Sequence, residues 1–484
     1  MRTKEIIGLA IFAVLALTLS SQPAQGKTSR NHWTIMSFAA GCNSSEETLL
    51  DDIAEMKKGF VDNQGVELIM LIDRVAGFSN DTSVFGEDFT DTRIYRIRHD
   101  KTERLDGAAE FPEITKTSNY DANMGDAHTL KKFIRYCKAH YPADHYALII
   151  YSHGSGQWVA YDDESNKDAI YTAEFTDVLS ANESVDFMGF DVCLMGGVEN
   201  MYQWRPGNGS FNAQVVIASA PATGPWAYDK ILERLKAGGG DNGEPDHTLG
   251  GKEKYCDPAT MTARDLGGLI FEEIRDGQPS ESWACYDLTK VEALKKAVDV
   301  LAQNLAKEAK KEDVEACRGI SLPKTFFYIQ PMITPGIVAT PYFDLYGLAK
   351  NIAASDRLSE VVKANATAVA RATDEVVVYS YGPVDDYPGF EDGKHGLYVF
   401  FPAGDWIWRG KRHWAYQYWY SPLDMTKEPE INLGVDLIRP YGKYFWCKDG
   451  AIPGNNKVEN WFELLDSWYD TSNGKDGGLN KYQW

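Results

Sequence analysis

The sequence predicts an α/β fold with a mainly parallel central sheet that is covered by helices on both faces. Continuous apolar runs alternate with amphipathic segments between residues 33 and 222, and several of these runs end in turns that contain glycine. Hydrophobic residues make up 44% of the 484-residue chain, as expected for a protein that buries a core. Parallel strands have such unbroken apolar runs because helices cover both faces of their sheet.

The expected elements follow from periodicity and from helix start and stop signals. A buried strand is predicted at 33–41. An amphipathic helix at 44–60 opens with Ser44 and Glu47 at capping-box spacing. A second strand at 66–75 is followed by an edge strand or hairpin arm at 93–100. A helix at 124–142 begins near Asp126 and stops at Pro142. Further strands are predicted at 145–156, 185–197, 214–222 and 394–404, and further helices at 262–276 and 288–312.

Two of these strands carry reactive side chains at their carboxyl ends. His153 follows YALIIYS, and Cys193 follows FMGFDV. Neighbouring parallel strands end at the same edge of a sheet, so the imidazole and the thiol can meet there. An imidazole favours the thiolate and then protonates the leaving amine. We therefore predict a His153–Cys193 dyad, with the backbone N–H groups of Gly154 and Cys193 as oxyanion donors.

Taken singly, each residue of this dyad has a simpler explanation. A buried cysteine is usually an inert small hydrophobe. A histidine at a strand end is more often hydrogen-bonded scaffold than catalyst. The pairing of matching strand ends 40 residues apart favours the catalytic interpretation.

The blocks YALIIYSHGSGQW, FDVCLMGGVE and NMGDAHTLKKF resemble the clostripain family of cysteine peptidases, and GLYVFFPAG resembles a strand of that family. The resemblance is spread over most of residues 31–404 and implies a caspase-like αβα sandwich. It implies that His153 is the general acid/base and Cys193 the nucleophile, with no required third acid. It also implies that Asp191 lines a pocket for the Arg or Lys that precedes the cut. Relatives tend to carry an acid soon after the strand at 214–222, but here the nearest one is Asp229.

Three segments are predicted along the chain. Residues 1–26 read as a signal peptide, 27–404 as the caspase-like peptidase domain, and 405–484 as an aromatic-rich C-terminal subdomain or extension. The first segment has Arg2 and Lys4, an apolar run at 6–19 and the small-x-small ending Ala24-Gln25-Gly26. That run is shorter than the roughly 20 apolar residues that span a bilayer. We expect a secreted or periplasmic protein that does not insert into a membrane.

Charge and cysteine spacing limit the partners and cofactors. The net charge of −21 disfavours nucleic acid and anionic membranes, so polypeptides are the expected partners. The seven cysteines include no CxxC pair, and we assign no metal ligand. The acids Asp162, Asp163, Glu164 and Asp168 would suit Ca²⁺, but they lack EF-hand spacing and fit a solvated loop better. We expect no required cofactor, with calcium as the alternative.

The polar loop at 159–175 contains one basic residue, Lys167. Exposed polar loops are where nicking concentrates, and a loop that follows the His153 strand end can act as a tethered inhibitor. We predict self-cleavage of the Lys167–Asp168 bond.

The sequence thus favours a secreted cysteine endopeptidase that acts through a thioester acyl-enzyme and cuts after Arg or Lys. The alternative is a catalytically weak caspase-like protein that binds peptide or glycan, with the Trp- and Tyr-rich stretch at 406–420 as its stacking surface.

Overall fold

The computed structural model places Asn31–Trp484 in one compact unit. It describes residues 31–240, 255–277, 281–318, 327–328, 342–383, 389–401, 407–408, 411–412, 444–452, 455 and 457–469. The predicted signal peptide and the side chains of the stretch at 406–420 lie outside the described residues.

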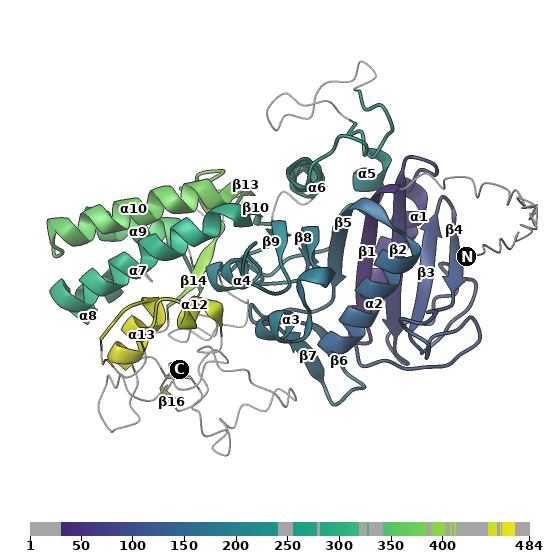
Figure 1. Cartoon of the computed structure of the whole chain (residues 1–484), viewed down its shortest axis with the longest axis horizontal. Coiled ribbons are helices and arrows are strands. Elements are labelled where there is room, and N and C mark those ends of the chain that lie inside the picture. The colour runs from purple at the N-terminus through teal and green to yellow at the C-terminus, as the bar shows by residue number, and fades with distance from the viewer. Residues whose placement is uncertain are drawn as a thin grey trace, which may run out of the picture. The chain divides into compact units, whose positions relative to one another are not determined.

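A nine-stranded sheet runs through the molecule in the order β13-β10-β9-β8-β5-β1-β2-β3-β4 (Figure 1). Its five central strands pair in parallel, whereas the strands at both edges are antiparallel to their neighbours. The predicted hairpin arm at 93–100 is confirmed as β3, which pairs with β4. The central strands are β1 (Asn31–Gly41), β2 (Val66–Arg74), β5 (Ala143–Tyr151), β8 (Val185–Asp191) and β9 (Ala213–Ala218), and the outer ones are β3 (Arg93–Arg98), β4 (Lys101–Leu105), β10 (Trp283–Asp287) and β13 (Val377–Tyr381).

Helices cover both faces of this sheet, which confirms the predicted αβα sandwich (Figure 1). Alternate residues of β1 point to opposite faces, as strand geometry requires. Met36 and Phe38 join one hydrophobic core with Phe133, while Ile35 joins the other core with Ile53. The helices are α1 (Glu46–Gly59), α2 (Ala127–His140), α3 (Thr172–Val178), α4 (Val198–Gln203), α5 (Tyr228–Glu233), α6 (Ala263–Gly277), α7 (Val291–Glu308), α8 (Lys311–Glu315), α9 (Leu345–Ala354), α10 (Glu360–Val376), α12 (Phe445–Lys448) and α13 (Trp461–Tyr469), with 3₁₀ turns at Ala181–Glu183, Leu288–Lys290 and Ala316–Arg318.

Smaller sheets flank the main one. The strand predicted at 394–404 is shorter, and it lies in a three-stranded sheet instead of the central one. This sheet contains β11 (Phe327–Tyr328), β12 (Tyr342–Asp344) and β14 (Tyr398–Phe400); two hairpins are formed by β6 (Trp158–Asp162) with β7 (Asp168–Tyr171) and by β15 (Ile407–Trp408) with β16 (Lys411–Arg412).

Two C-terminal helices pack against the peptidase fold. Trp446 of α12 and Trp461 of α13 are buried in the same core as Leu294 of α7. The indole N–H of Trp461 donates a hydrogen bond to the carbonyl oxygen of Phe400, at 3.0 Å. The division of the chain at residues 404 and 405 stays a prediction.

The start of α1 differs from the expected capping box. The helix begins at Glu46 with Ser45 as its N-cap, and no side chain caps it. The side-chain oxygen of Asn43 instead accepts hydrogen bonds from the backbone N–H of Ser45, at 3.0 Å, and from its hydroxyl, at 2.6 Å. The predicted capping role of Ser44 is therefore wrong, because Asn43 organises this turn and leaves the Ser44 hydroxyl available elsewhere.

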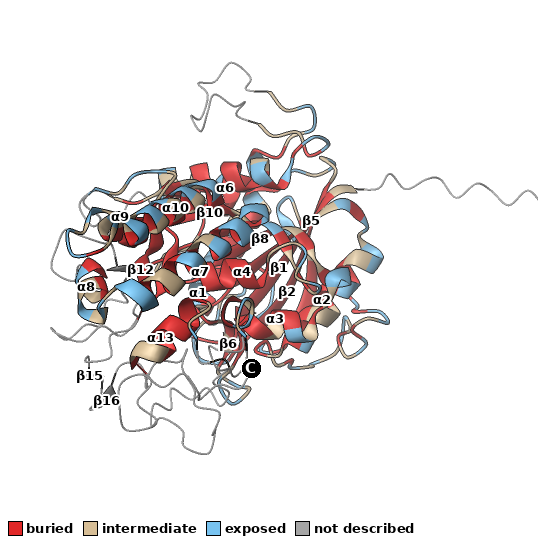
Figure 2. Cartoon of the chain, turned by 60° about the vertical axis from the view of Figure 1, so that its left-hand side comes forward, coloured by how far each residue is buried: buried red, intermediate tan, exposed pale blue. Residues whose placement is uncertain are grey.

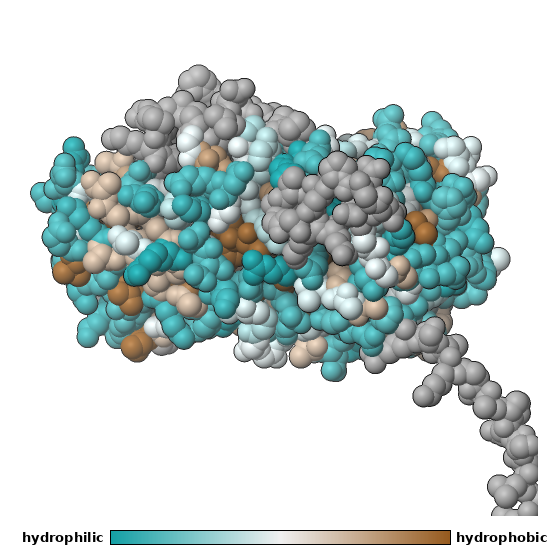
Figure 3. Space-filling view, turned by 90° about the horizontal axis from the view of Figure 1, so that it is seen from above, coloured by the Kyte–Doolittle hydropathy of each residue, from teal (hydrophilic) through white to brown (hydrophobic). Residues whose placement is uncertain are grey.

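Buried and hydrophilic residues are separated as expected for a folded domain with a core. Buried residues concentrate in the sheet and on the helix faces that touch it (Figure 2). The face seen in Figure 3 is mostly hydrophilic, with hydrophobic side chains in small groups. Among the described helices, none has both the length and the apolar character needed to cross a bilayer.

Candidate active site

The two predicted dyad residues follow paired positions of neighbouring strands. β5 and β8 are parallel, and Tyr151 is the register partner of Asp191. His153 and Cys193 each lie two residues beyond these partners. The fold therefore brings both residues to the same edge of the sheet, as expected for the carboxyl ends of adjacent parallel strands.

His153 is half-buried and is held by the loop after β1. The distance between its Nε2 and the Ser44 hydroxyl oxygen is 2.9 Å. Burial lowers the pKa of the imidazole below its ordinary value, and the nearby carboxylate of Asp163 opposes this shift. A neutral imidazole can accept a proton, which is the state a general base requires.

Gly154 packs directly on the backbone of the second strand end. A Cβ added at Gly154 would lie 2.8 Å from the carbonyl oxygen of Cys193. Any larger residue at this position would push the two strand ends apart. Glycine is thus required for close approach of backbone to backbone.

Cys193 is half-buried, and the segment after β9 covers its thiol. The backbone N–H of Thr223 donates to the Cys193 sulfur at 3.4 Å, and the thiol lies 3.8 Å from the Thr223 carbonyl oxygen. Burial raises the pKa of this thiol, while the Thr223 N–H opposes the rise. Among the described residues, no hydrogen bond joins Cys193 to His153. The raised pKa of the thiol and the lowered pKa of the imidazole both favour the uncharged forms of the pair.

The backbone is strained directly after Cys193. Leu194 has φ of +68°, a left-handed conformation that residues with a Cβ rarely adopt. Its N–H donates to the carbonyl oxygen of Pro221 at 2.9 Å, which fixes this turn against the segment that also contacts the thiol. Strain of this kind persists only where the surrounding structure enforces it.

Asp191 ends β8 and is 4% exposed. Its carboxylate accepts a hydrogen bond from the Tyr228 hydroxyl at 2.9 Å, and it also accepts one from the backbone of Trp226. Burial raises its pKa despite both bonds. The acid nearest to β9 in sequence is engaged elsewhere, because the Asp229 carboxylate forms an ion pair with Lys58 of α1 at 2.6 Å.

Asp52 of α1 was not identified from the sequence. It is 3% exposed, and one of its carboxylate oxygens has no hydrogen-bond partner. Its electrostatic neighbours include Asp191. The sequence does contain a sign of its unusual position. Asp52 lies on the same helix face as Leu49, Ile53 and Met56, where a charged residue is unexpected.

The predicted cleavage site lies in the turn between β6 and β7. Lys167 is exposed, has φ of +61°, and forms no ion pair with any described residue. The N–H of Asp168 donates to the carbonyl oxygen of Ser165 at 3.2 Å, and its carboxylate accepts from Asn123 at 2.8 Å. The turn is therefore closed by hydrogen bonds on the carboxyl side of Lys167.

The acids proposed as calcium ligands have separate roles in this hairpin. Asp162 is buried and accepts hydrogen bonds from the backbone N–H groups of Glu164, Ser165 and Met124. Glu164 is exposed, and Asp163 is half-buried near His153.

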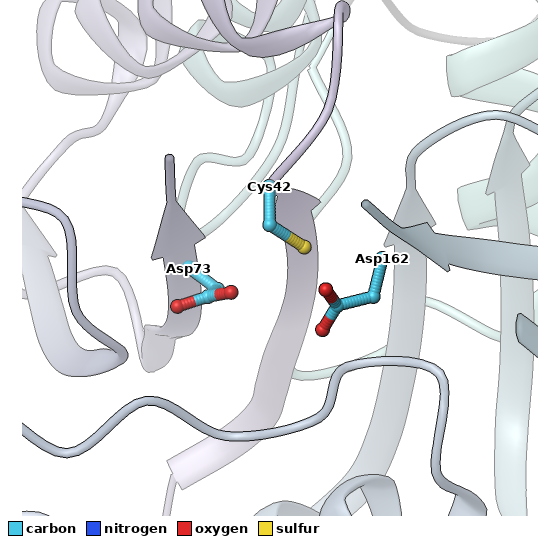
Figure 4. Close-up of side chains that lie close together, drawn as sticks. All are labelled: Cys42, Asp73 and Asp162. Atoms are coloured by element: carbon cyan, nitrogen blue, oxygen red, sulfur yellow. The ribbon is translucent and has the colours of Figure 1, made fainter. Parts of the chain in front are cut away.

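Asp162 converges instead with Cys42 and Asp73, from the ends of β1 and β2 (Figure 4). The three candidate ligand atoms all lie within 4.8 Å of one another. Burial raises the pKa of both Cys42 and Asp73, and Asp73 also accepts a hydrogen bond from the Thr92 hydroxyl at 2.7 Å. A thiol with two carboxylates is a donor set that a divalent cation could use, and Asp162 would link it to the hairpin.

Comparisons with known proteins identify the family of this chain. Residues 37–468 match the sequence profile of the clostripain family. The chain is 44% identical over 480 residues to clostripain of Hathewaya histolytica, covering 93% of this chain and 89% of that protein.

Two solved structures share the fold. One is a secreted C11 cysteine protease from Bacteroides thetaiotaomicron in complex with an irreversible peptide inhibitor; it is 17% identical, with a TM-score of 0.52, over 78% of this chain and 94% of the other. The second is an inactive zymogen C11 protease from Parabacteroides distasonis, also 17% identical, with a TM-score of 0.51, over 77% and 93% of the two chains.

Proposed function

Because the chain belongs to the clostripain family and is a cysteine peptidase, we propose that it is a secreted endopeptidase that cuts after Arg or Lys, with His153 and Cys193 as its dyad. The observation that carries this assignment is the register pair Tyr151–Asp191, which sets the two residues at equivalent strand ends. Membership of a peptidase family favours turnover over the alternative of a weak binding protein.

The neutral resting pair suits a mechanism in which proton transfer accompanies attack. His153 takes the proton from Cys193 as the sulfur attacks the substrate carbonyl carbon. The N–H groups of Gly154 and Cys193 stabilise the oxyanion, and His153 then gives its proton to the leaving amine. Water hydrolyses the thioester with His153 again as the base. Substrate must displace Thr223 from the sulfur before this sequence begins.

Asp191 would bind the basic side chain that precedes the cut. It lies two residues from the proposed nucleophile and is buried, so a neutral or acidic substrate residue would leave the carboxylate without a cationic partner. Profiling cleavage of a peptide library should show Arg and Lys at this position. A profile dominated by apolar residues would contradict the specificity, but it would leave the dyad assignment intact.

The dyad is tested with purified Cys193→Ala and His153→Ala proteins. Each should lose essentially all peptide hydrolysis while keeping its circular dichroism spectrum and melting temperature, because members of one catalytic unit act together. Substantial cleavage by the Cys193→Ala protein would refute the assignment. Selective labelling of Cys193 by an acyloxymethyl-ketone peptide in the wild-type protein is the matching positive result.

Self-cleavage at Lys167–Asp168 is proposed as the maturation step. Lys167 is in a left-handed turn, so the hairpin must open before this bond can lie extended across the dyad. Wild type should give two fragments with a new N-terminus at Asp168, while Cys193→Ala and Lys167→Ala remain single chains. A fully active wild type that stays uncut would contradict this step.

Export and metal independence complete the proposal. Removal of residues 1–26 would release a soluble enzyme to the periplasm or the medium, which mass determination of the exported protein would check. The dyad needs no metal for the steps above, so dialysis against EDTA should leave activity unchanged. A loss that only Ca²⁺ restores would instead support the calcium alternative.

A further inference from the structure

We propose that Asp52 is a second acid of the pocket for the basic residue, and that Asp52 and Asp191 form one paired-carboxylate site that a Lys or Arg side chain completes. This inference rests on the proposed function and extends it to a residue on a different element, 139 positions away in the sequence.

Asp52 is buried with one carboxylate oxygen that has no hydrogen-bond partner among the described residues. It lies on the sheet-facing side of α1 and is 3% exposed, yet its Oδ2 accepts no hydrogen bond from any described residue. Burying a carboxylate without such bonds is costly, and native proteins rarely tolerate it without a reason. A cationic ligand that enters during function would supply the missing bonds.

Hydrogen bonds connect α1 to Asp191 through Tyr228. One helical turn after Asp52, the Glu55 carboxylate accepts the backbone N–H of Tyr228 at 3.0 Å. The hydroxyl of the same tyrosine donates to Asp191 at 2.9 Å. Residues three apart on a helix share a face, so Asp52 and Glu55 both face this cluster.

A second connection lies at the start of the helix. Tyr151 is the register partner of Asp191, and its hydroxyl donates to the carbonyl oxygen of Ser45 at 3.1 Å. Tyr151 and Tyr228 both interact electrostatically with Asp52 and with Asp191. Asp52 is thus an electrostatic neighbour of Asp191 and of the two tyrosines beside it.

The charged groups that act on Asp52 are all acidic. They are Asp191, Glu55 and Asp51, and the two neighbouring tyrosines carry no positive charge. Burial and these neighbours raise the pKa of Asp52, and burial raises the pKa of Asp191. Two buried carboxyls in this situation retain protons at a pH where isolated ones would be ionised, and an arriving cation releases them.

In this arrangement, Asp52 takes the place of the acid that the sequence lacks after β9. Residues 219–226 contain no acid, and Asp229 is held by Lys58. In this proposal, Asp52 of α1 supplies the second carboxylate instead. A guanidinium or ammonium group between Asp52 and Asp191 would be paired on two sides.

The first test is kinetic and uses Asp52→Asn, Asp191→Asn and the control Asp51→Asn, whose side chain is exposed on the same helix. Matched peptides carry Arg, Lys or uncharged citrulline before the cut. Asp52→Asn should lower kcat/KM for the Arg and Lys peptides by about 10- to 100-fold, the range for a lost charge-assisted hydrogen bond, and leave the citrulline peptide nearly unchanged. Asp51→Asn removes only the smallest of the charge effects on Asp52 and should stay close to wild type.

The second test does not require turnover. Agmatine binding to the Cys193→Ala protein is measured by calorimetry in two buffers of different ionisation enthalpy. Binding between about pH 6 and 7 should release close to one proton per agmatine bound. Adding Asp52→Asn should weaken binding and lower the number of protons released, because Asp191 alone then remains to release one, whereas Asp51→Asn should change both far less.

The outcomes separate this inference from the proposed function. If Asp191→Asn loses its preference for Arg over citrulline while Asp52→Asn keeps the full wild-type ratio, Asp52 is not part of the pocket and the inference is wrong. If neither variant changes that ratio, the basic pocket lies elsewhere and both proposals fail. If Asp52→Asn does not fold, agmatine binding to the Cys193→Ala protein that also carries Asp191→Asn decides. Proton release in that protein assigns the proton to Asp52, and binding without proton release overturns the inference.

Discussion

The Ser44 hydroxyl oxygen lies 2.9 Å from Nε2 of His153, so the loop after β1 holds the imidazole of a residue that is 109 positions away. This contact links the start of α1 to the end of β5. If His153 is the general base as proposed, Ser44 is a positioning residue for it, with no direct part in bond making or breaking.

Replacing Ser44 with Ala should lower kcat by about 3- to 10-fold with little change in KM, because one hydrogen bond that orients the imidazole is lost. Ser44→Thr keeps the hydroxyl and should retain most of the activity. The neighbouring Ser45→Ala protein, which loses only a bond to Asn43, serves as control. Equal losses in the Ala and Thr variants would argue against an orienting role.

The pH profile should have its acid limb below the ordinary imidazole value of 6.5, because burial lowers the pKa of His153. Activity appears as the imidazole loses its proton, so kcat/KM rises with pH through this lowered value. Asp163→Asn should move the limb further to acid, because that carboxylate favours the protonated ring. Rate profiles of the two proteins check this, and a limb above 6.5 in wild type would contradict it.

Tyr228→Phe should weaken binding of basic substrates while leaving the dyad intact. The hydroxyl favours the ionised form of Asp191, so its loss raises the pKa of this carboxyl further. We expect KM for Arg peptides to rise by about 3- to 10-fold. The pH at which KM reaches its low plateau should also move upward. Unchanged KM over the whole pH range would show that Tyr228 has no influence on the pocket.

Stability should fall as pH rises, owing to the buried acids Asp52 and Asp191. Folding raises their pKa above the ordinary value of 3.8, so the folded protein binds protons more tightly than the unfolded one. Their contribution is present below that value and is lost as pH rises through the raised values.

Asp52→Asn removes one of these groups, so its melting temperature at about pH 8 should exceed that of wild type by roughly 2 °C or more. The difference should shrink towards about pH 4, where the wild-type carboxyl is protonated. Asp51→Asn is again the control. A variant that is less stable than wild type at both pH values would show that the Asp52 carboxyl stabilises the folded protein.

The placement of His153 and Cys193 beyond paired strand ends could be predicted because its signals are local. Unbroken apolar runs end in polar residues at both strand ends. The only further assumption was that the strands before His153 and Cys193 are neighbours in the sheet. The partners of these residues depend on long-range contacts that no local pattern contains. Ser44 has capping-box spacing, but Asn43 competes for the turn. The strand that includes Tyr398 has the expected sequence, although nothing in it indicates which sheet it joins.

Asp52 shows a different limit of sequence interpretation. Its position on the apolar face of α1 was visible as an exception to the helical pattern. A single acid on such a face has many explanations, and only the position of α1 against Tyr228 and Asp191 distinguishes among them.

The hairpin turn at Lys167 also has a consequence for how the protein could be assembled. A cut there leaves β1, β2 and β5 on one fragment and β8 and β9 on the other. The boundary between the fragments would run along the β5–β8 ladder in the middle of the sheet, from Ala147–Phe187 to Tyr151–Asp191. The two pieces would behave as an obligate heterodimer with half of the dyad on each subunit. Separate expression of residues 27–167 and 168–484, followed by mixing, would then be a complementation assay in which activity reports assembly.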